Sequence, residues 1–255
     1  MDCFVKIFGC SHSAHGPFYN TNSLVSFFKS NGYEKVYVKN MALSGNANDK
    51  IIDDVYRSAE SETGENVFYI IQYSYLNRLW LPNDMDMIFH SFLLDETTGE
   101  WPPHIPSEKK KYLKNMYESF VTCFYDDELY FKDLIKKIDF LKAYLDNKGI
   151  KFIHFLWESL SNKEELVETK KEFHNLYIND KIESGYIDKK YFNKLRKLDL
   201  IEFEQNIFNF SRISFDKKIT NWHTFGGGNY DLHLTENGNQ YLAAVLLNKL
   251  YEKIQ

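Results

Sequence analysis

The sequence predicts an α/β fold of three layers, in which helices cover both faces of a parallel sheet of about five strands. Short runs of β-branched and aromatic residues alternate with helical apolar patterns from residue 4 to residue 71, as in βαβ units. The run at residues 67–71 is apolar throughout, which is typical of a central strand buried on both faces. With 255 residues, the chain can bury a large core without a disulfide or a metal.

The first part of the chain divides into three strands and two helices. We expect the strands at residues 4–8, 36–38 and 67–71, because each is a short β-rich run. Apolar side chains recur at helical spacing over residues 24–28 and 51–59, which predicts a helix between each pair of strands. Residues that can cap these two helices precede them: Thr21 and Asn22 before the first, Asn46 or Asn48 before the second.

The later elements are less regular. Residues 79–107 hold four of the five prolines and are expected to form a long loop. A helical pattern covers residues 108–147, with a break near Asp126 and Asp127, and residues 150–156 form the fourth expected strand. Further helical patterns follow at residues 163–198 and 236–253.

The domain organisation follows from this order of elements. We find no internal repeat, and we expect one domain over residues 1–255. Residues 79–135 and 160–228 interrupt the regular alternation of strands and helices. We expect these two segments to be insertions that elaborate the domain.

Composition excludes several classes of function. The 36 acidic residues outnumber the 31 lysines and arginines, so we expect no nucleic-acid partner. No run of about 18 apolar residues is present, so we expect no membrane insertion. The three cysteines, Cys3, Cys10 and Cys123, form no disulfide framework and indicate free thiols. With no signal peptide at the N-terminus, we expect a cytoplasmic protein. The oligomeric state is left open.

Polar loops follow the first three strands, at the edge of an α/β sheet where ligands bind. Ser11 comes directly after the first strand, where backbone N–H groups can stabilise a developing oxyanion. Asp231 and His233 are two residues apart before the last helix, so in an extended segment both side chains point to the same side. The carboxylate can then orient the imidazole, which is the logic of a Ser-His-Asp triad.

Three short blocks in these loops resemble those of the SGNH or GDSL-type serine hydrolase family. They are Gly9-Cys10-Ser11, Ser44-Gly45-Asn46 and Asp231-Leu232-His233. The resemblance implies a flavodoxin-like strand order and an esterase without a metal or other cofactor. It also implies that Ser11 is the nucleophile, His233 the base and Asp231 its partner, with backbone N–H groups of Ser11 and Gly45 as oxyanion donors.

The chain departs from the family pattern at two places. Cys10 stands where the family has an aspartate. The family's Gly-x-Asn-Asp block, whose asparagine is an oxyanion donor, becomes Gln-Tyr-Ser-Tyr at residues 72–75. Ser74 falls at the place of the missing donor. The side-chain amides that could replace it are those of Gln72, Asn48 and Asn77, and the sequence does not choose among them.

The expected substrate is a small-molecule or glycan ester that carries an O-acetyl or other short acyl group. Polar loop residues near the expected site that could contact it are His12, Gln72, Asn77 and Arg78, of which Arg78 suits an anionic group. Exclusion of water would turn the same triad to acyl transfer. A non-catalytic glycan-binding protein on the same fold is the competing class.

Simpler interpretations exist for the same residues. Ser11 could cap the first helix, Gly45 could be a turn glycine, and Arg78 could pair with a nearby acid. Cys10, His12 and His15 are zinc-type ligands, but their spacing fits no structural zinc site. We therefore expect no metal.

Overall fold

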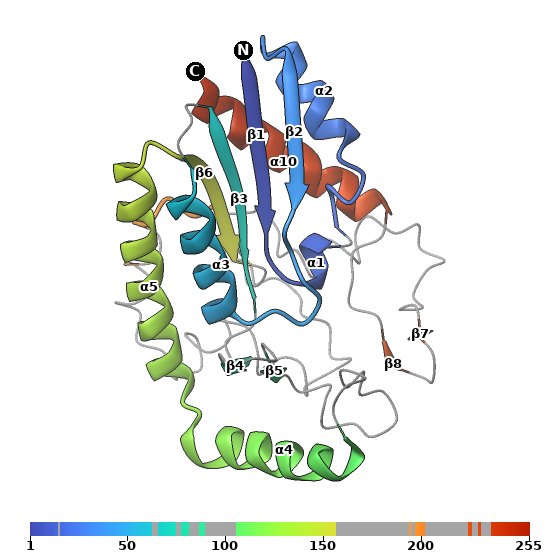
Figure 1. Ribbon diagram of the computed structural model, residues 1–255, viewed down its shortest axis with the longest axis vertical. Helices are drawn as coiled ribbons and strands as arrows, with labels where there is room; N and C mark the ends of the chain where they lie inside the picture. Colours follow the sequence, from blue (N-terminus) through green and yellow to red (C-terminus); the bar gives the residue numbers. More distant parts are fainter. Residues whose placement is uncertain are drawn as a thin grey trace, which may run out of the picture.

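The computed structural model describes residues 1–14, 16–62, 66–74, 78–81, 87–89, 106–156, 194, 197–201, 224–225, 229–230 and 236–255. Its centre is a parallel sheet of four strands in the order β2-β1-β3-β6 (Figure 1). These strands are β1 (Asp2–Phe8), β2 (Lys35–Asn40), β3 (Val67–Tyr73) and β6 (Lys151–Leu156). The α/β fold class and the parallel sheet are confirmed. Four of the expected strands, of about five, lie in the described part of the chain.

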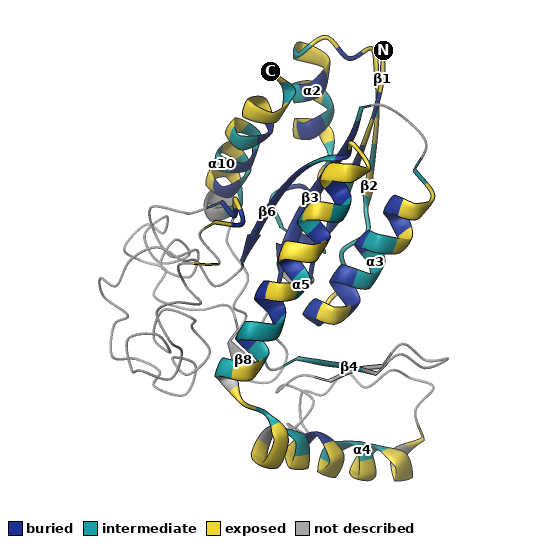
Figure 2. Ribbon diagram, turned by 90° about the vertical axis from the view of Figure 1, so that its left-hand side faces the viewer, coloured by how far each residue is buried: buried dark blue, intermediate teal, exposed yellow. Residues whose placement is uncertain are grey.

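Four helices form the outer layers. Helices α3 (Asn48–Glu60) and α5 (Asp127–Asn147) contribute to one buried cluster, and α2 (Asn22–Ser30) and α10 (Glu236–Ile254) contribute to the other. Each helix turns its buried stripe towards the sheet and its exposed side outwards (Figure 2). No helix in the described part of the chain is long and apolar enough to cross a membrane.

The central strand β3 holds the two layers together. It pairs with β1 on one side and β6 on the other, and all seven of its residues are buried. Because strand side chains alternate, Phe68 and Ile70 join one core cluster while Tyr69 and Ile71 join the other. Each such side chain contributes roughly 1.5–3 kcal/mol through burial. The expectation that this strand is central is confirmed.

Helix boundaries differ in detail from the expected ones. Neither expected asparagine caps α3: Ala47 holds the N-cap position, and Asn48 is the first helical residue. Thr21 holds the N-cap position of α2 but makes no capping hydrogen bond. The break between the central helices is confirmed, because Asp126 caps α5 by accepting a hydrogen bond from the Leu129 amide. Helix α5 is preceded by α4 (Ser107–Ser119) and by a π-helical turn, η2 (Phe120–Phe124).

The proline-rich segment was expected to be a loop, which is wrong in part. Strands β4 (Leu79–Leu81) and β5 (Met87–Phe89) pair antiparallel within it, since an apolar run at each position can form a short ladder. A second small pair joins β7 (Thr224–Phe225) to β8 (Asn229–Tyr230). The helical pattern expected at residues 163–198 lies almost entirely outside the described residues.

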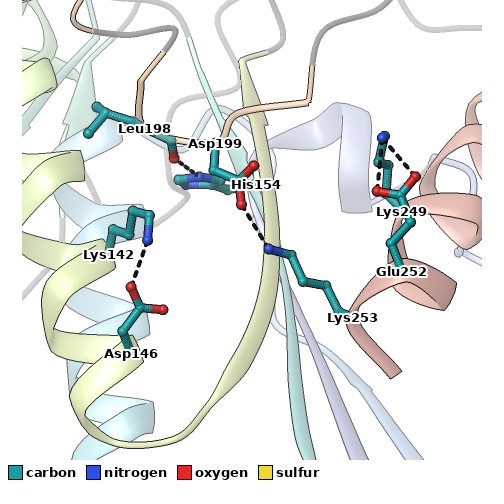
Figure 3. Close-up of polar contacts among 8 residues, drawn as sticks. All are labelled: Lys142, Asp146, His154, Leu198, Asp199, Lys249, Glu252 and Lys253. Carbon is teal, nitrogen blue, oxygen red and sulfur yellow. Dashed lines mark hydrogen bonds and ion pairs between the residues drawn. The ribbon is translucent and has the colours of Figure 1, made fainter. Parts of the chain in front are cut away.

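A buried histidine links the sheet to the turn that contains Leu198. The Nε2 atom of His154 lies 2.8 Å from the Leu198 carbonyl oxygen, and its Nδ1 lies 3.2 Å from the Tyr73 hydroxyl oxygen (Figure 3). A carbonyl only accepts, so the proton is on Nε2 and the tyrosine donates to Nδ1. The neighbouring Asp199 pairs with Lys253 of α10 at 2.8 Å. These contacts make His154 a structural residue.

This histidine predicts acid sensitivity. Burial lowers the pKa of His154 to about 4, although the Leu198 hydrogen bond and the Asp199 charge oppose the shift. Between pH 6.5 and about 4, the unfolded chain therefore binds a proton that the folded chain does not. We expect the free energy of unfolding to fall by about 3 kcal/mol over this range, and His154 to contribute no pH dependence above it.

Urea unfolding of wild type and His154→Gln, measured from pH 7.5 to pH 4, tests this expectation. Other groups also titrate in this range, so the informative quantity is the difference between the two proteins at each pH. Glutamine keeps a donor for the Leu198 carbonyl but does not titrate. A difference that stays constant between pH 7.5 and pH 4 would contradict the expected role of His154.

Candidate active site

The candidate site lies at the carboxyl ends of β1, β2 and β3. In Figure 1 these ends point downwards, and α1 (Ser11–Ala14), β4, β5 and α4 lie at or below them. Parallel strands bring the loops that follow them to one edge of the sheet. Residues 9–11 and 44–46, which resemble the family's blocks, therefore meet here with residues 72–75, which depart from the family's pattern.

The first block forms a tight turn into α1. Ser11 is the first residue of this four-residue helix, and the amides of Ser13 and Ala14 both donate to the Cys10 carbonyl, at 3.0 and 2.9 Å. Gly9 is required here by close packing. A Cβ atom at this position would lie 2.7 Å from Oε1 of Gln72 and 2.9 Å from Oγ of Ser13.

Gln72 braces this turn from the end of β3. Its side chain is fully buried, and its Oε1 accepts from the Ser13 hydroxyl at 2.7 Å and from the Cys10 amide at 3.4 Å. Its Nε2 donates to the Cys10 sulfur at 3.1 Å. All of these partners belong to the turn that carries Ser11. Direct contact of Gln72 with a substrate stays a prediction.

The glycine block is joined to the nucleophile block through one carbonyl. The oxygen of Gly9 accepts from the Leu43 amide at 3.1 Å and from Nδ2 of Asn46 at 3.3 Å. Gly45 between them has a φ of 77°, a left-handed conformation that glycine adopts without strain. The Oδ1 atom of Asn46 is buried and has no partner within the described residues.

Asn48 clamps the end of the third strand. Its Oδ1 accepts from the Ser74 amide at 2.6 Å, and its Nδ2 donates to the Ser74 carbonyl at 3.0 Å. Both polar atoms of this side chain therefore hold Ser74 by its backbone. Ser74 is itself buried, with 4% of its surface exposed.

Arg78 joins the second and third loops. Its Nη1 donates to the Ser74 hydroxyl oxygen at 2.7 Å and to the Asn46 carbonyl at 3.1 Å. Its charge also acts on Tyr117 of α4: burial raises the pKa of this phenol to about 12, and the nearby guanidinium opposes that rise. The charge of Arg78 is therefore felt both at the sheet edge and on α4.

Not all of the predicted site residues are placed by the structure. It brings together Gly45, Asn48, Gln72, Ser74 and Arg78, with the backbone of Ser11 on the same turn as Cys10. Asn77, Asp231 and His233 lie outside the described residues, as do the side chains of Ser11 and His12. The triad therefore stays a prediction.

Two roles in this site could not be inferred from the sequence. Cys10 is fully buried and accepts a hydrogen bond from the Gln72 side-chain amide, at a position where an unpaired carboxylate would be costly. Asn40, near the end of β2, donates to the Ser13 carbonyl at 3.1 Å. Both are tertiary contacts between residues far apart in sequence. The three cysteines are free, as expected.

Comparisons with known proteins find a distant likeness among solved structures. No family model matches the chain, and no curated protein matches it in sequence. Among solved structures, the chain is similar to an acetyl xylan esterase, with 13% sequence identity and a TM-score of 0.49. The alignment covers 97% of this chain and 99% of that one. A likeness this distant assigns no activity to the chain.

Proposed function

We propose that the protein is a serine ester hydrolase that removes an O-acetyl or other short acyl group from a carbohydrate or related metabolite. The observation that carries this proposal is the junction of the nucleophile and glycine blocks at Gly9, whose carbonyl accepts from Leu43 and Asn46. This junction fixes the turn that carries Ser11 beside Gly45. A nucleophile and oxyanion donors must be held together in this way before substrate arrives.

The proposed reaction has two halves. The Ser11 hydroxyl oxygen attacks the carbonyl carbon of the ester while His233 accepts its proton, and the carbonyl π electrons move to the oxygen. The resulting oxyanion is stabilised by the backbone N–H groups of Ser11 and Gly45. Collapse breaks the bond to the alcohol, which leaves with the proton from His233. Water, deprotonated by His233, then attacks the acyl-enzyme and releases the carboxylic acid and free Ser11.

The surroundings of the site support a carbohydrate substrate. Trp80 of β4 is half-buried, and the Nζ atom of Lys50 on α3 lies 5.8 Å from the centroid of its ring. An indole ring at the edge of a binding site suits a sugar ring. The glycine block leads directly into α3, and α3 contacts β4, so Trp80 lies near the end of the sheet where the chemistry is proposed.

Labelling with a fluorophosphonate tests the proposal. We expect intact-protein mass spectrometry to find one adduct on wild type and none on Ser11→Ala, because only an activated serine reacts. Ser26→Ala, which changes an exposed serine of α2, is the matched control and should label like wild type. Circular dichroism checks that every variant is folded.

The outcomes separate the three candidate functions. A labelled wild type that cleaves 4-nitrophenyl acetate supports a hydrolase. A labelled wild type that transfers its acetyl group to an added sugar faster than to water indicates an O-acyltransferase with the same triad. A folded wild type without an adduct contradicts both and favours the glycan-binding alternative.

A further inference from the structure

The strongest unassigned feature of the site is the contact between Arg78 and Ser74. A guanidinium carries only donors, so the Ser74 hydroxyl oxygen must be the acceptor in the 2.7 Å bond from Arg78. The single proton of that hydroxyl is then directed away from the arginine. The Ser74 backbone cannot offer a further donor, because its amide already donates to Asn48.

The position of this proton matters for the proposed reaction. The Ser74 hydroxyl oxygen and the Asn46 carbonyl oxygen both accept from the same Nη1 atom of Arg78. The hydroxyl therefore lies beside the residue that directly follows Gly45. In the part of the chain that the structure describes, no acceptor for the Ser74 proton is found. A buried hydroxyl group whose proton has no acceptor within the protein is a preorganised hydrogen-bond donor.

We propose that the Ser74 hydroxyl donates to the oxyanion and that Arg78 directs its proton and strengthens the bond with its charge. This inference rests on the proposed function and assigns the donor that the sequence leaves open. Ser74 is then a catalytic residue, whereas Arg78 is a positioning residue that acts through it. Asn48 fixes the Ser74 backbone and is not itself the donor.

The arrangement favours an uncharged acyl group. The guanidinium is already engaged by the protein at two oxygens, and a positive charge held behind a donor stabilises negative charge that develops only in the transition state. Loss of either residue should therefore lower kcat more than it raises KM. An arginine that binds an anionic group of the substrate would instead change KM.

Hydrolysis of 4-nitrophenyl acetate by variants at these two positions tests the inference. We expect Ser74→Ala to lower kcat roughly 10²- to 10³-fold with little change in KM, and Ser74→Thr to keep most of the activity. Arg78→Met should lower kcat roughly 10- to 100-fold, and Arg78→Lys should recover part of that loss. The double variant Ser74→Ala/Arg78→Met should be no slower than Ser74→Ala alone.

Matched controls distinguish this chemistry from general damage. Arg57→Met removes an exposed arginine of α3 that pairs with Asp53, and Ser26→Ala removes an exposed hydroxyl; both should leave kcat unchanged. If Ser74→Ala does not fold, Ser74→Cys replaces it, since a thiol fills a similar volume but donates weakly.

Two results would overturn the inference while leaving the proposed function intact. One is a Ser74→Ala variant with wild-type kcat in a protein whose Ser11 is labelled by fluorophosphonate. The other is a rise in KM at constant kcat in Arg78→Met, which would make Arg78 a substrate-binding residue. A wild type that is neither labelled nor active would instead overturn the proposed function, and this inference with it.

Discussion

Replacing Ser11 with alanine is expected to lower ester turnover by roughly 10⁴- to 10⁶-fold, and replacing His233 with alanine by a similar factor. The two residues perform one proton transfer, so removal of either abolishes the attack. The double variant should consequently be no slower than either single variant. Values of kcat/KM for 4-nitrophenyl acetate, measured on all four proteins, check this result.

Non-additivity is the informative part of this experiment. If the losses of the two single variants multiplied in the double variant, Ser11 and His233 would be acting independently and the proposed triad would be wrong. Activity retained in His233→Ala would mean that another group is the base. His154 is not that group, because it is buried in β6 and bonded to Tyr73 and Leu198.

Replacing Gln72 with leucine is expected to lower the free energy of unfolding by about 4 kcal/mol. Leucine fills nearly the same volume but leaves the Cys10 amide and the Ser13 hydroxyl buried without their acceptor, and each such group costs about 1–3 kcal/mol. Urea unfolding monitored by circular dichroism measures the change. Ser11 should also react more slowly with fluorophosphonate, because its turn loses the brace.

A control at an exposed glutamine isolates this effect. Gln240 lies on the exposed side of α10, so Gln240→Leu should change the free energy of unfolding by less than about 0.5 kcal/mol. A loss below about 1 kcal/mol in Gln72→Leu would show that the buried amide is not needed to hold the turn.

The regular elements were largely predictable from local pattern. The expected strand at residues 67–71 is β3, and the expected break near Asp126 is the N-terminal cap of α5. These patterns are short-range: a strand buried on both faces must be apolar, and a capping carboxylate must precede its helix. Elements without such a pattern were missed, including the hairpin of β4 and β5.

The candidate site was predictable only in outline. The loops that follow parallel strands meet at one edge of the sheet, whatever residues they contain. The strand order alone therefore brings together the loops that carry Ser11, Gly45 and Ser74. The partners of individual amides do not follow from it. Asn48 was a candidate both for a helix cap and for an oxyanion donor, but its side chain clamps Ser74, a contact across 26 residues.

The sequence by itself determined the α/β class, the central strand and the residues available for chemistry, because hydrophobic periodicity and residue type are local properties. Only the tertiary structure decided how the polar side chains are paired. Gln72 bonds the turn that carries Ser11, Asn48 holds the Ser74 backbone, and Arg78 donates to the Ser74 hydroxyl oxygen. Hydrogen bonds of this kind require separate loops to be placed relative to one another within a few tenths of an ångström. Such positions cannot be inferred from the order of the residues alone.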